Sequence, residues 1–235
     1  MAVRCRGITK SFPAGDGFVE VLHGIDFDGL AGKVTMLVGP SGCGKTTLIS
    51  IIAGILSPTN GTVEVCGSLI TKLRDSEKVA FRRTALGFVF QQYNLLPSLT
   101  AAENAAIPLV AAGMPMAAAA RKAGEILGRI GMGQHVAKMP NQLSGGQQQR
   151  VAIARAFVHA PRLIVCDEPT AALDAEAGRT VLEILREAVL APDRAVIVVT
   201  HDSRIYRFAD RIVAMEDGRI QSVESASRGQ LSEVA

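Results

Sequence analysis

A glycine-rich loop ends in a lysine and a threonine, in the string Gly39-Pro-Ser-Gly-Cys-Gly-Lys45-Thr46. An apolar run, 34–38, precedes this loop, and a helical pattern follows it. In such a strand–loop–helix unit, glycines let backbone N–H groups turn toward phosphate groups, and the helix N-terminus adds its positive dipole end. Lys45 then reaches the β- and γ-phosphates of a nucleotide, and the Thr46 hydroxyl can ligate Mg²⁺. A glycine-rich turn could match this spacing by chance, but the flanking strand and helix favour a phosphate-binding loop.

Two acidic residues, Asp167 and Glu168, directly follow four apolar residues, 163–166. The apolar run predicts a central strand, and the Asp167 carboxylate at its end can hold Mg²⁺ through the water shell of the ion. Glu168 can then accept a proton from a water molecule that attacks phosphorus. An acidic pair after a strand is a weak signal by itself, because strand ends are commonly solvated. Downstream of a phosphate-binding loop in one α/β body, it predicts nucleotide hydrolysis.

A third feature is the string Leu143-Ser144-Gly145-Gly146-Gln147, which opens an apolar helical pattern. Ser144 is a preferred N-cap residue, and the two glycines leave backbone N–H groups accessible behind it. This combination predicts an anion site at a helix N-terminus. The alternative is a plain helix cap, and these residues taken alone do not decide between the two.

Strand and helix patterns together predict an α/β fold. Strands are expected at 3–8, 19–27, 34–38, 63–65, 86–90, 163–166, 195–200, 211–215 and 219–223, the last two joined by a hairpin turn at 216–218. Helical pattern covers 45–55, and 101–158 is helical with no convincing strand. We therefore expect an α/β core and β lobe at 1–91 and 159–225. A helical subdomain at 92–158 interrupts them, and a loose tail follows at 226–235.

The composition argues against several classes of protein. Of 235 residues, 48% are hydrophobic and only 4% aromatic, so Val, Ile, Leu and Ala must build the core. The net charge of +3 is scattered, whereas a nucleic-acid-binding protein usually has a basic stripe. The cysteines form no Cys-x-x-Cys pair and are expected to be small buried residues in a reducing compartment: Cys5, Cys43, Cys66 and Cys166. No signal-peptide pattern opens the sequence, and its most apolar stretch, 105–120, is too short to span a membrane. We therefore expect a soluble cytoplasmic protein.

Taken in order, the motifs resemble those of ATP-binding cassette (ABC) ATPases. The two loops described first correspond to the Walker A and Walker B motifs. The string from Leu143 matches the signature motif, which in that family binds the γ-phosphate of ATP held by the opposite subunit. Three further strings resemble the Q-loop, the D-loop and the switch-histidine loop: Phe88-Val-Phe-Gln91, Pro169-Thr-Ala-Ala-Leu173-Asp174 and Val198-Val-Thr-His201-Asp202. The resemblance covers residues 3–223.

The resemblance implies a P-loop NTPase fold, with a RecA-like core, an antiparallel β lobe and an inserted helical subdomain. It implies ATP and Mg²⁺ as cofactors, with catalysis by Lys45, Gln91, Glu168 and His201, and with Thr46, Gln91 and Asp167 attending the metal. The residues expected to contact nucleotide are Phe12, Gly39, Pro40, Ser41, Gly42, Cys43, Gly44, Lys45, Thr46, Thr47, Ser144, Gly145, Gly146, Gln147 and Asp174.

Some residues depart from the family pattern or match no motif. Phe12 stands where the family usually stacks a tyrosine on adenine, and Cys43 and Cys166 are mild departures within the two phosphate-site motifs. None of these changes removes a catalytic group. The other histidines match no motif and are expected to be ordinary residues: His23, His135 and His159.

The resemblance also implies partners. The phosphate-binding loop and the signature lie on different lobes, so two chains must close around two MgATP. The helical subdomain and the Gln91 loop would pass this motion to an integral membrane permease, with the ATPase bound at the inner face of the cell membrane. The strings around 92–100 and 143–150 resemble lipoprotein-release and macrolide-export ATPases, whose permeases have a large periplasmic domain and can require a periplasmic adaptor.

Other members of the family offer alternative functions. Importers of methionine and polar amino acids carry similar strings, and a regulatory ABC ATPase that acts on a membrane partner without transport is a second candidate. A soluble ABC ATPase of DNA repair or translation is disfavoured, because the sequence shows neither a coiled-coil insertion nor a second cassette. The substrate stays unnamed, because the membrane subunit makes the substrate contacts in this family.

Overall fold

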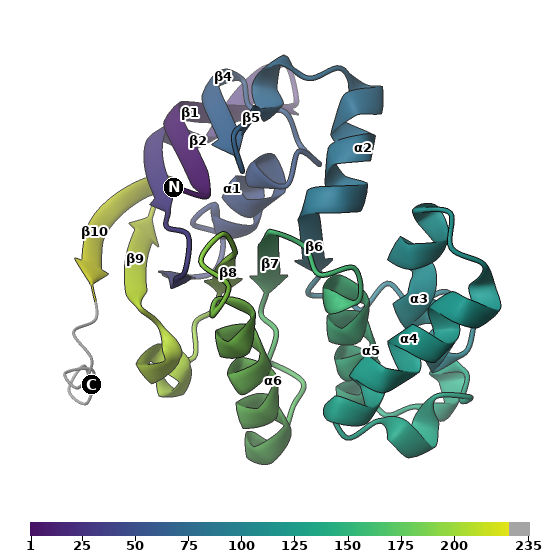
Figure 1. Ribbon diagram of the computed structural model, residues 1–235. Helices are drawn as coiled ribbons and strands as arrows, with labels where there is room; N and C mark the ends of the chain where they lie inside the picture. The colour runs from purple at the N-terminus through teal and green to yellow at the C-terminus, as the bar shows by residue number, and fades with distance from the viewer. Residues whose placement is uncertain (226–235) are drawn as a thin grey trace.

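Two β-sheets and a separate group of helices make up residues 1–225, the part of the chain that the computed structural model describes (Figure 1). The tail predicted at 226–235 lies outside these residues. One sheet has four strands in the order β2-β1-β4-β5, and the other has six in the order β10-β9-β3-β8-β7-β6. The predicted α/β fold is confirmed.

The six-stranded sheet forms the core of the fold. Parallel pairing joins β3 (Val34–Val38), β6 (Leu86–Val89), β7 (Leu163–Asp167), β8 (Ala195–Val199) and β9. Every residue of β3, β7 and β8 is buried, as expected for a sheet covered on both faces. The predicted hairpin of β9 (Arg211–Glu216) and β10 (Arg219–Ser225) pairs with β3 through β9.

Successive residues of the central strands enter two different hydrophobic layers. Leu37 and Ile197 pack with the apolar side chains of α1 (Lys45–Ile52), whereas Met36 and Val198 pack with those of α6 (Ala175–Ala188). This alternation follows from the two-residue period of a strand. The loops that follow these strands are therefore anchored by packing on both faces of the sheet.

The four-stranded antiparallel sheet covers α1 from the other side. It consists of β1 (Val3–Ala14), β2 (Gly17–Gly29), β4 (Asn60–Val65) and the short β5 (Ser68–Leu69). Its inward residues share one hydrophobic cluster with α1 and the core sheet. The helix α2 (Asp75–Ala85) lies beside this lobe and leads into β6 (Figure 1).

Three helices form a group at the lower right of Figure 1, and the last of them also packs on the core sheet through Ile153 and Ala156. They are α3 (Ala101–Ala111), α4 (Met116–Arg129) and α5 (Gly145–Phe157), and they enclose a hydrophobic cluster of their own. Within residues 1–225, no helix is long and apolar enough to cross a membrane. A strand-free helical segment was predicted at 101–158, and the structure confirms it.

Several element boundaries differ from the predictions. The helix predicted at 45–55 ends at Ile52, and Gly54 shortly afterwards takes a left-handed conformation with φ of 63°. Asn60 and Gly61, expected in a loop, begin β4. Cys66 is half-buried rather than buried, unlike the other three cysteines.

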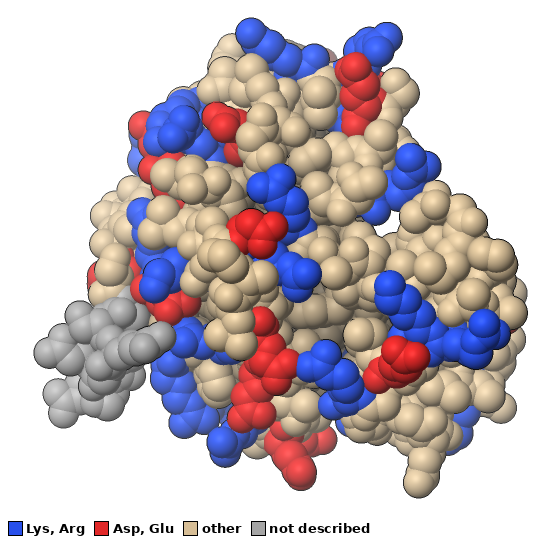
Figure 2. Space-filling view, in the orientation of Figure 1, with Lys and Arg blue, Asp and Glu red and all other residues tan. Residues whose placement is uncertain are grey.

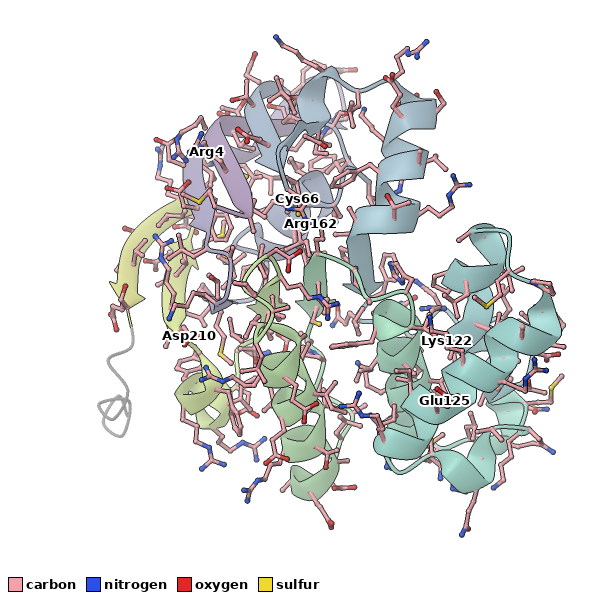
Figure 3. The ribbon with its side chains drawn as sticks, viewed as in Figure 1. Arg4, Cys66, Lys122, Glu125, Arg162 and Asp210 are labelled. Atoms are coloured by element: carbon pink, nitrogen blue, oxygen red, sulfur yellow. The ribbon has the colours of Figure 1, made fainter. Side chains whose placement is uncertain are left out.

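The face shown in Figure 2 mixes charges of both signs over all the lobes. The contact between Arg162 and Cys66 joins two lobes on this face, where the two side chains are labelled close together (Figure 3). The Arg162 guanidinium donates to the Cys66 carbonyl oxygen at 3.4 Å. This contact ties the start of β7 to the turn between β4 and β5.

Candidate active site

A cavity of about 440 Å³ opens where β3, β7 and β8 end. The glycine-rich loop forms one wall, and the residues after β6, β7 and β8 form the other. The predicted residues that line the cavity are Gly39, Pro40, Ser41, Gly42, Gly44, Lys45, Thr46, Thr47, Gln91, Asp167, Glu168 and His201. Segments far apart in the sequence therefore meet at one site.

The glycine-rich loop adopts a backbone path that requires glycine at two positions. Gly39 has φ of 143°, and a Cβ there would lie 2.0 Å from the Met215 carbonyl oxygen. Gly44 has φ of 98°, and its Cβ would lie 2.7 Å from a methyl group of Leu22. Side chains at either position would push the loop away from β9 or β2. The loop is thus packed directly against the C-terminal hairpin and the β lobe.

Lys45 is held inside this loop. Its Nζ donates to the carbonyl oxygens of Gly39 at 2.8 Å and Pro40 at 2.7 Å, and it lies 3.6 Å from the Cys43 sulfur. Lys45 is only 8% exposed, and within residues 1–225 no carboxylate is among its hydrogen-bond partners. A buried ammonium with neutral partners leaves its charge available to an anion in the cavity.

Asp167 and Thr46 meet at the floor of the cavity. The Thr46 hydroxyl donates to Asp167 Oδ2 at 2.9 Å. Burial, the dominant cause, and the neighbouring Glu168 raise the pKa of Asp167, against the opposing influence of the Thr46 hydrogen bond and Lys45. A buried carboxylate of this kind gains from a cation.

The oxygen donors around this floor suit a hard divalent cation. Asp167, Thr46 and Gln91 supply a carboxylate, a hydroxyl and an amide, which is the ligand chemistry of Mg²⁺. Among residues 1–225, no three His, Cys, Asp or Glu side chains gather into a metal site. Mg²⁺ commonly takes one or two protein ligands and completes its shell with water and phosphate, so the residues present fit this ion.

Glu168 and His201 form a pair at the mouth of the cavity. His201 Nδ1 donates to Glu168 Oε1 at 2.7 Å. Glu168 has φ of 52°, a left-handed conformation that is strained for this residue type, and its backbone N–H donates to the Val199 carbonyl oxygen. The strand end and the imidazole together hold a carboxylate over the cavity, where it can accept a proton.

The signature residues lie outside this cavity, on the helical group. Ser144 caps α5, with Ser144 Oγ accepting from the Gln147 N–H at 3.3 Å and Gln147 Oε1 accepting from the Ser144 N–H at 2.9 Å. Ser144 and Gly145 are exposed. At Gly146 a Cβ would lie 3.0 Å from the Ala172 carbonyl oxygen, so this helix end packs closely on the loop before α6.

Three other predicted residues also lie outside the cavity lining. Phe12 lies on β1, half-buried, with the Lys10 ammonium 5.0 Å from its ring centroid. Asp174 caps α6 by accepting from the Ala177 N–H at 2.8 Å. Cys43 is buried, and its side chain is not part of the lining.

The lining includes two residues that were not among the predicted site residues, Val21 and Val199, although Val199 lies within the switch-histidine string. Val21 lies on β2, so the β lobe contributes one wall of the cavity. Both contribute aliphatic side chains and backbone rather than a reactive group. Their residue types therefore carried no chemical signal.

Comparison with known proteins places this geometry in a family. The sequence profile of the ABC transporter family matches residues 22–171. The chain belongs to the ABC transporter family. Its fold is that of an ABC ATPase cassette: it superposes with a TM-score of 0.91 and 37% identity on a dimeric post-hydrolysis state of the ATP-binding cassette MJ0796 bound to ADP and Pi, covering 95% of this chain and 98% of that one.

Relatives in the ABC family are similar in sequence to this protein over most of its length. The macrolide export ATP-binding/permease protein MacB of Agrobacterium fabrum is 42% identical over 94% of this chain. An uncharacterised ABC transporter ATP-binding protein of Mycobacterium tuberculosis is 44% identical over 89% of this chain and 63% of its own length. The chain spans about a third of the length of the MacB relatives, 34% for that of Agrobacterium fabrum. The predicted membership of the ABC transporter family is confirmed.

Proposed function

We propose that this ABC ATPase binds MgATP in the 440 Å³ cavity and hydrolyses it as a dimer. Each of the two sites in the dimer is formed by residues from both chains. One chain contributes the glycine-rich loop, Asp167, Glu168 and His201. The other contributes Ser144 and the glycines behind it. The dimer drives a membrane permease of the macrolide- or lipoprotein-export type.

The separation of the two anion-binding elements carries this proposal. Lys45 and the loop line the cavity, whereas the capped N-terminus of α5 lies outside it with Ser144 exposed. A helix N-terminus capped by serine and followed by two glycines offers backbone donors to an anion. A second copy that covers the cavity would supply this missing wall, and the dimeric form of the similar cassette supports that arrangement.

The residues of the cavity divide the work of phosphoryl transfer. The loop N–H groups and Lys45 bind the phosphates, while Asp167, Thr46 and Gln91 would hold Mg²⁺, which neutralises charge on the phosphate oxygens when bound. Glu168 accepts the proton of the attacking water as its oxygen bonds to the γ-phosphorus, and the bond to the β-phosphate oxygen breaks to release ADP. His201 fixes the Glu168 carboxylate in position through the 2.7 Å hydrogen bond.

The partner we propose is an integral membrane permease, with this domain at its cytoplasmic face. The similarity to MacB proteins, which combine ATP-binding and permease functions, supports the exporter class over the importer class. Gln91 lines the cavity directly after β6 and before the helical group, so a change at the γ-phosphate reaches that group through this segment. A periplasmic adaptor is part of the same proposal.

Subunit mixing tests the composite site. Ser144→Arg places a bulky cation at the exposed helix end and leaves the cavity of its own chain intact, so monomeric ATP binding should persist and hydrolysis should fail. Mixed with Lys45→Ala chains, it forms a dimer with one doubly damaged and one intact site. We expect hydrolysis to recover in part in the mixture. Normal hydrolysis by Ser144→Arg alone would refute the shared site.

A further inference from the structure

His135, which matches no motif and was expected to be ordinary, contacts the signature. It ends a short 3₁₀ turn, Gly133–His135, between α4 and α5. Its Nε2 lies 3.3 Å from Gln147 Nε2, and both side chains are partly buried. We propose that His135 is a positioning residue, which holds the Gln147 amide so that the cap at Ser144 keeps one geometry.

The direction of each hydrogen bond follows from one unambiguous donor. The Ser144 backbone N–H faces the Gln147 side chain at 2.9 Å, so the atom facing it must be the amide oxygen. The other end of the amide is then NH₂, which only donates. His135 Nε2 must therefore accept, and an accepting Nε2 requires neutral imidazole with its proton on Nδ1.

The opposite side of the ring carries the cost of this arrangement. His135 Nδ1 is buried and has no hydrogen-bond partner among the described residues. A buried N–H without a partner is unfavourable, so the contact with Gln147 has to offset this cost. Within residues 1–225, the side chain of His135 makes a single hydrogen bond, to Gln147. Without an acceptor at this place, the amide could rotate and turn its NH₂ toward the Ser144 N–H, which would break the cap.

The inference depends on the proposed function, because the cap matters for turnover only if the α5 N-terminus binds the phosphate of a second chain. His135 lies on the helical group and lines no part of the cavity, so it acts on hydrolysis and not on nucleotide binding by the single chain. An effect on hydrolysis without an effect on nucleotide binding distinguishes His135 from a residue that merely supports the fold.

Two substitutions at His135 test whether the hydrogen-bond acceptor or the shape of the ring is needed. His135→Leu removes the acceptor, and His135→Gln returns an oxygen near the position of Nε2. We expect His135→Leu to lower kcat about fivefold, the usual effect of one net hydrogen bond, with unchanged ATP affinity of the monomer. His135→Gln should restore most of kcat. Equal kcat for parent and His135→Leu, or equal loss in both variants, would overturn the inference.

A double-mutant cycle tests whether the effect passes through Gln147. In a Gln147→Ala background, His135→Leu should have no further effect on kcat; an additive loss would contradict the mechanism. His159→Leu is the matched control, since His159 also has a buried unpartnered Nδ1 but bonds to the Leu86 carbonyl oxygen. It should lower the melting temperature and keep kcat.

The outcome with Ser144→Arg separates the two proposals. If Ser144→Arg hydrolyses ATP normally, the shared site fails whatever His135 does. If Ser144→Arg is inactive and His135→Leu keeps full kcat, only the role of His135 fails.

Discussion

Replacing Lys45 by methionine separates nucleotide binding from fold stability more sharply than any other change at this site. Lys45 is 8% exposed, and methionine keeps most of its apolar stem while removing the ammonium that donates to the Gly39 and Pro40 carbonyl oxygens. Both carbonyls belong to residues that line the cavity, so water can replace the lost donor. The free energy of unfolding should therefore change by less than about 1 kcal/mol.

The loss in ATP affinity should be much larger. A hydrogen bond to a charged group contributes about 1.5–3 kcal/mol, which corresponds to a roughly 10- to 150-fold increase in Kd for ATP. Titration calorimetry at fixed Mg²⁺ measures the affinity, and thermal denaturation without nucleotide measures the stability.

Lys33→Met is the control for the removal of one lysine. Lys33 directly precedes β3, with its side chain 49% exposed and its Nζ 3.8 Å from Asp210, and such a surface pair contributes little. It should leave both measurements unchanged. An unaltered ATP affinity in Lys45→Met would refute the phosphate-binding role of the loop, and a large loss of stability would refute the water-replacement argument.

Three further changes test the remaining parts of the site. Glu168→Gln should keep ATP binding and lower turnover about 10²–10⁴-fold in a single-turnover assay, and wild-type hydrolysis would remove Glu168 from the mechanism. Asp167 has a raised pKa, so its contribution to stability is fully present below the ordinary Asp pKa and is lost as the pH rises through the raised value. The Asp167→Asn variant should therefore melt at a higher temperature than the parent near neutral pH and at the same temperature in acid. It should hydrolyse no ATP. A parent more stable at neutral pH than Asp167→Asn would contradict the sign of that shift. Phe12→Ala should weaken ATP and ADP alike by about 1–3 kcal/mol in titration calorimetry, and loss of stability with intact affinity would mean that the ring only packs in the β lobe.

The residues of the phosphate-binding loop could be predicted from the sequence because their chemistry and spacing are coupled. Only glycine tolerates the path at Gly39 and Gly44, and only a long cation reaches from the first helical residue into the loop. Asp167 and Glu168 could be placed for a similar reason, since four apolar residues mark the end of a buried strand. In these motifs, the residue types themselves indicate the local backbone geometry.

Two helices and one contact were not predicted from the sequence, and the reasons differ. The helix α2 buries no residue, so it has no apolar stripe for the sequence to show. The helix α6 does have one, with Val181, Leu182 and Leu185 buried at helical spacing, and that pattern was available. The contact between His135 and Gln147 could not be predicted, because the sequence does not fix the backbone path of the short turn before the signature.

The strand order of the core sheet has a consequence for folding during translation. The strand β3, which carries the phosphate-binding loop, lies between β8 and β9, and both are translated much later. The close approach of Gly39 to the Met215 carbonyl oxygen and the hydrogen bond from the Gly218 N–H to the Cys43 carbonyl oxygen likewise await the last hairpin. Such non-local pairing closes late in folding. A nascent chain on the ribosome therefore carries the complete loop sequence without a nucleotide site until β9 and its turn emerge, and acquires ATP affinity only then.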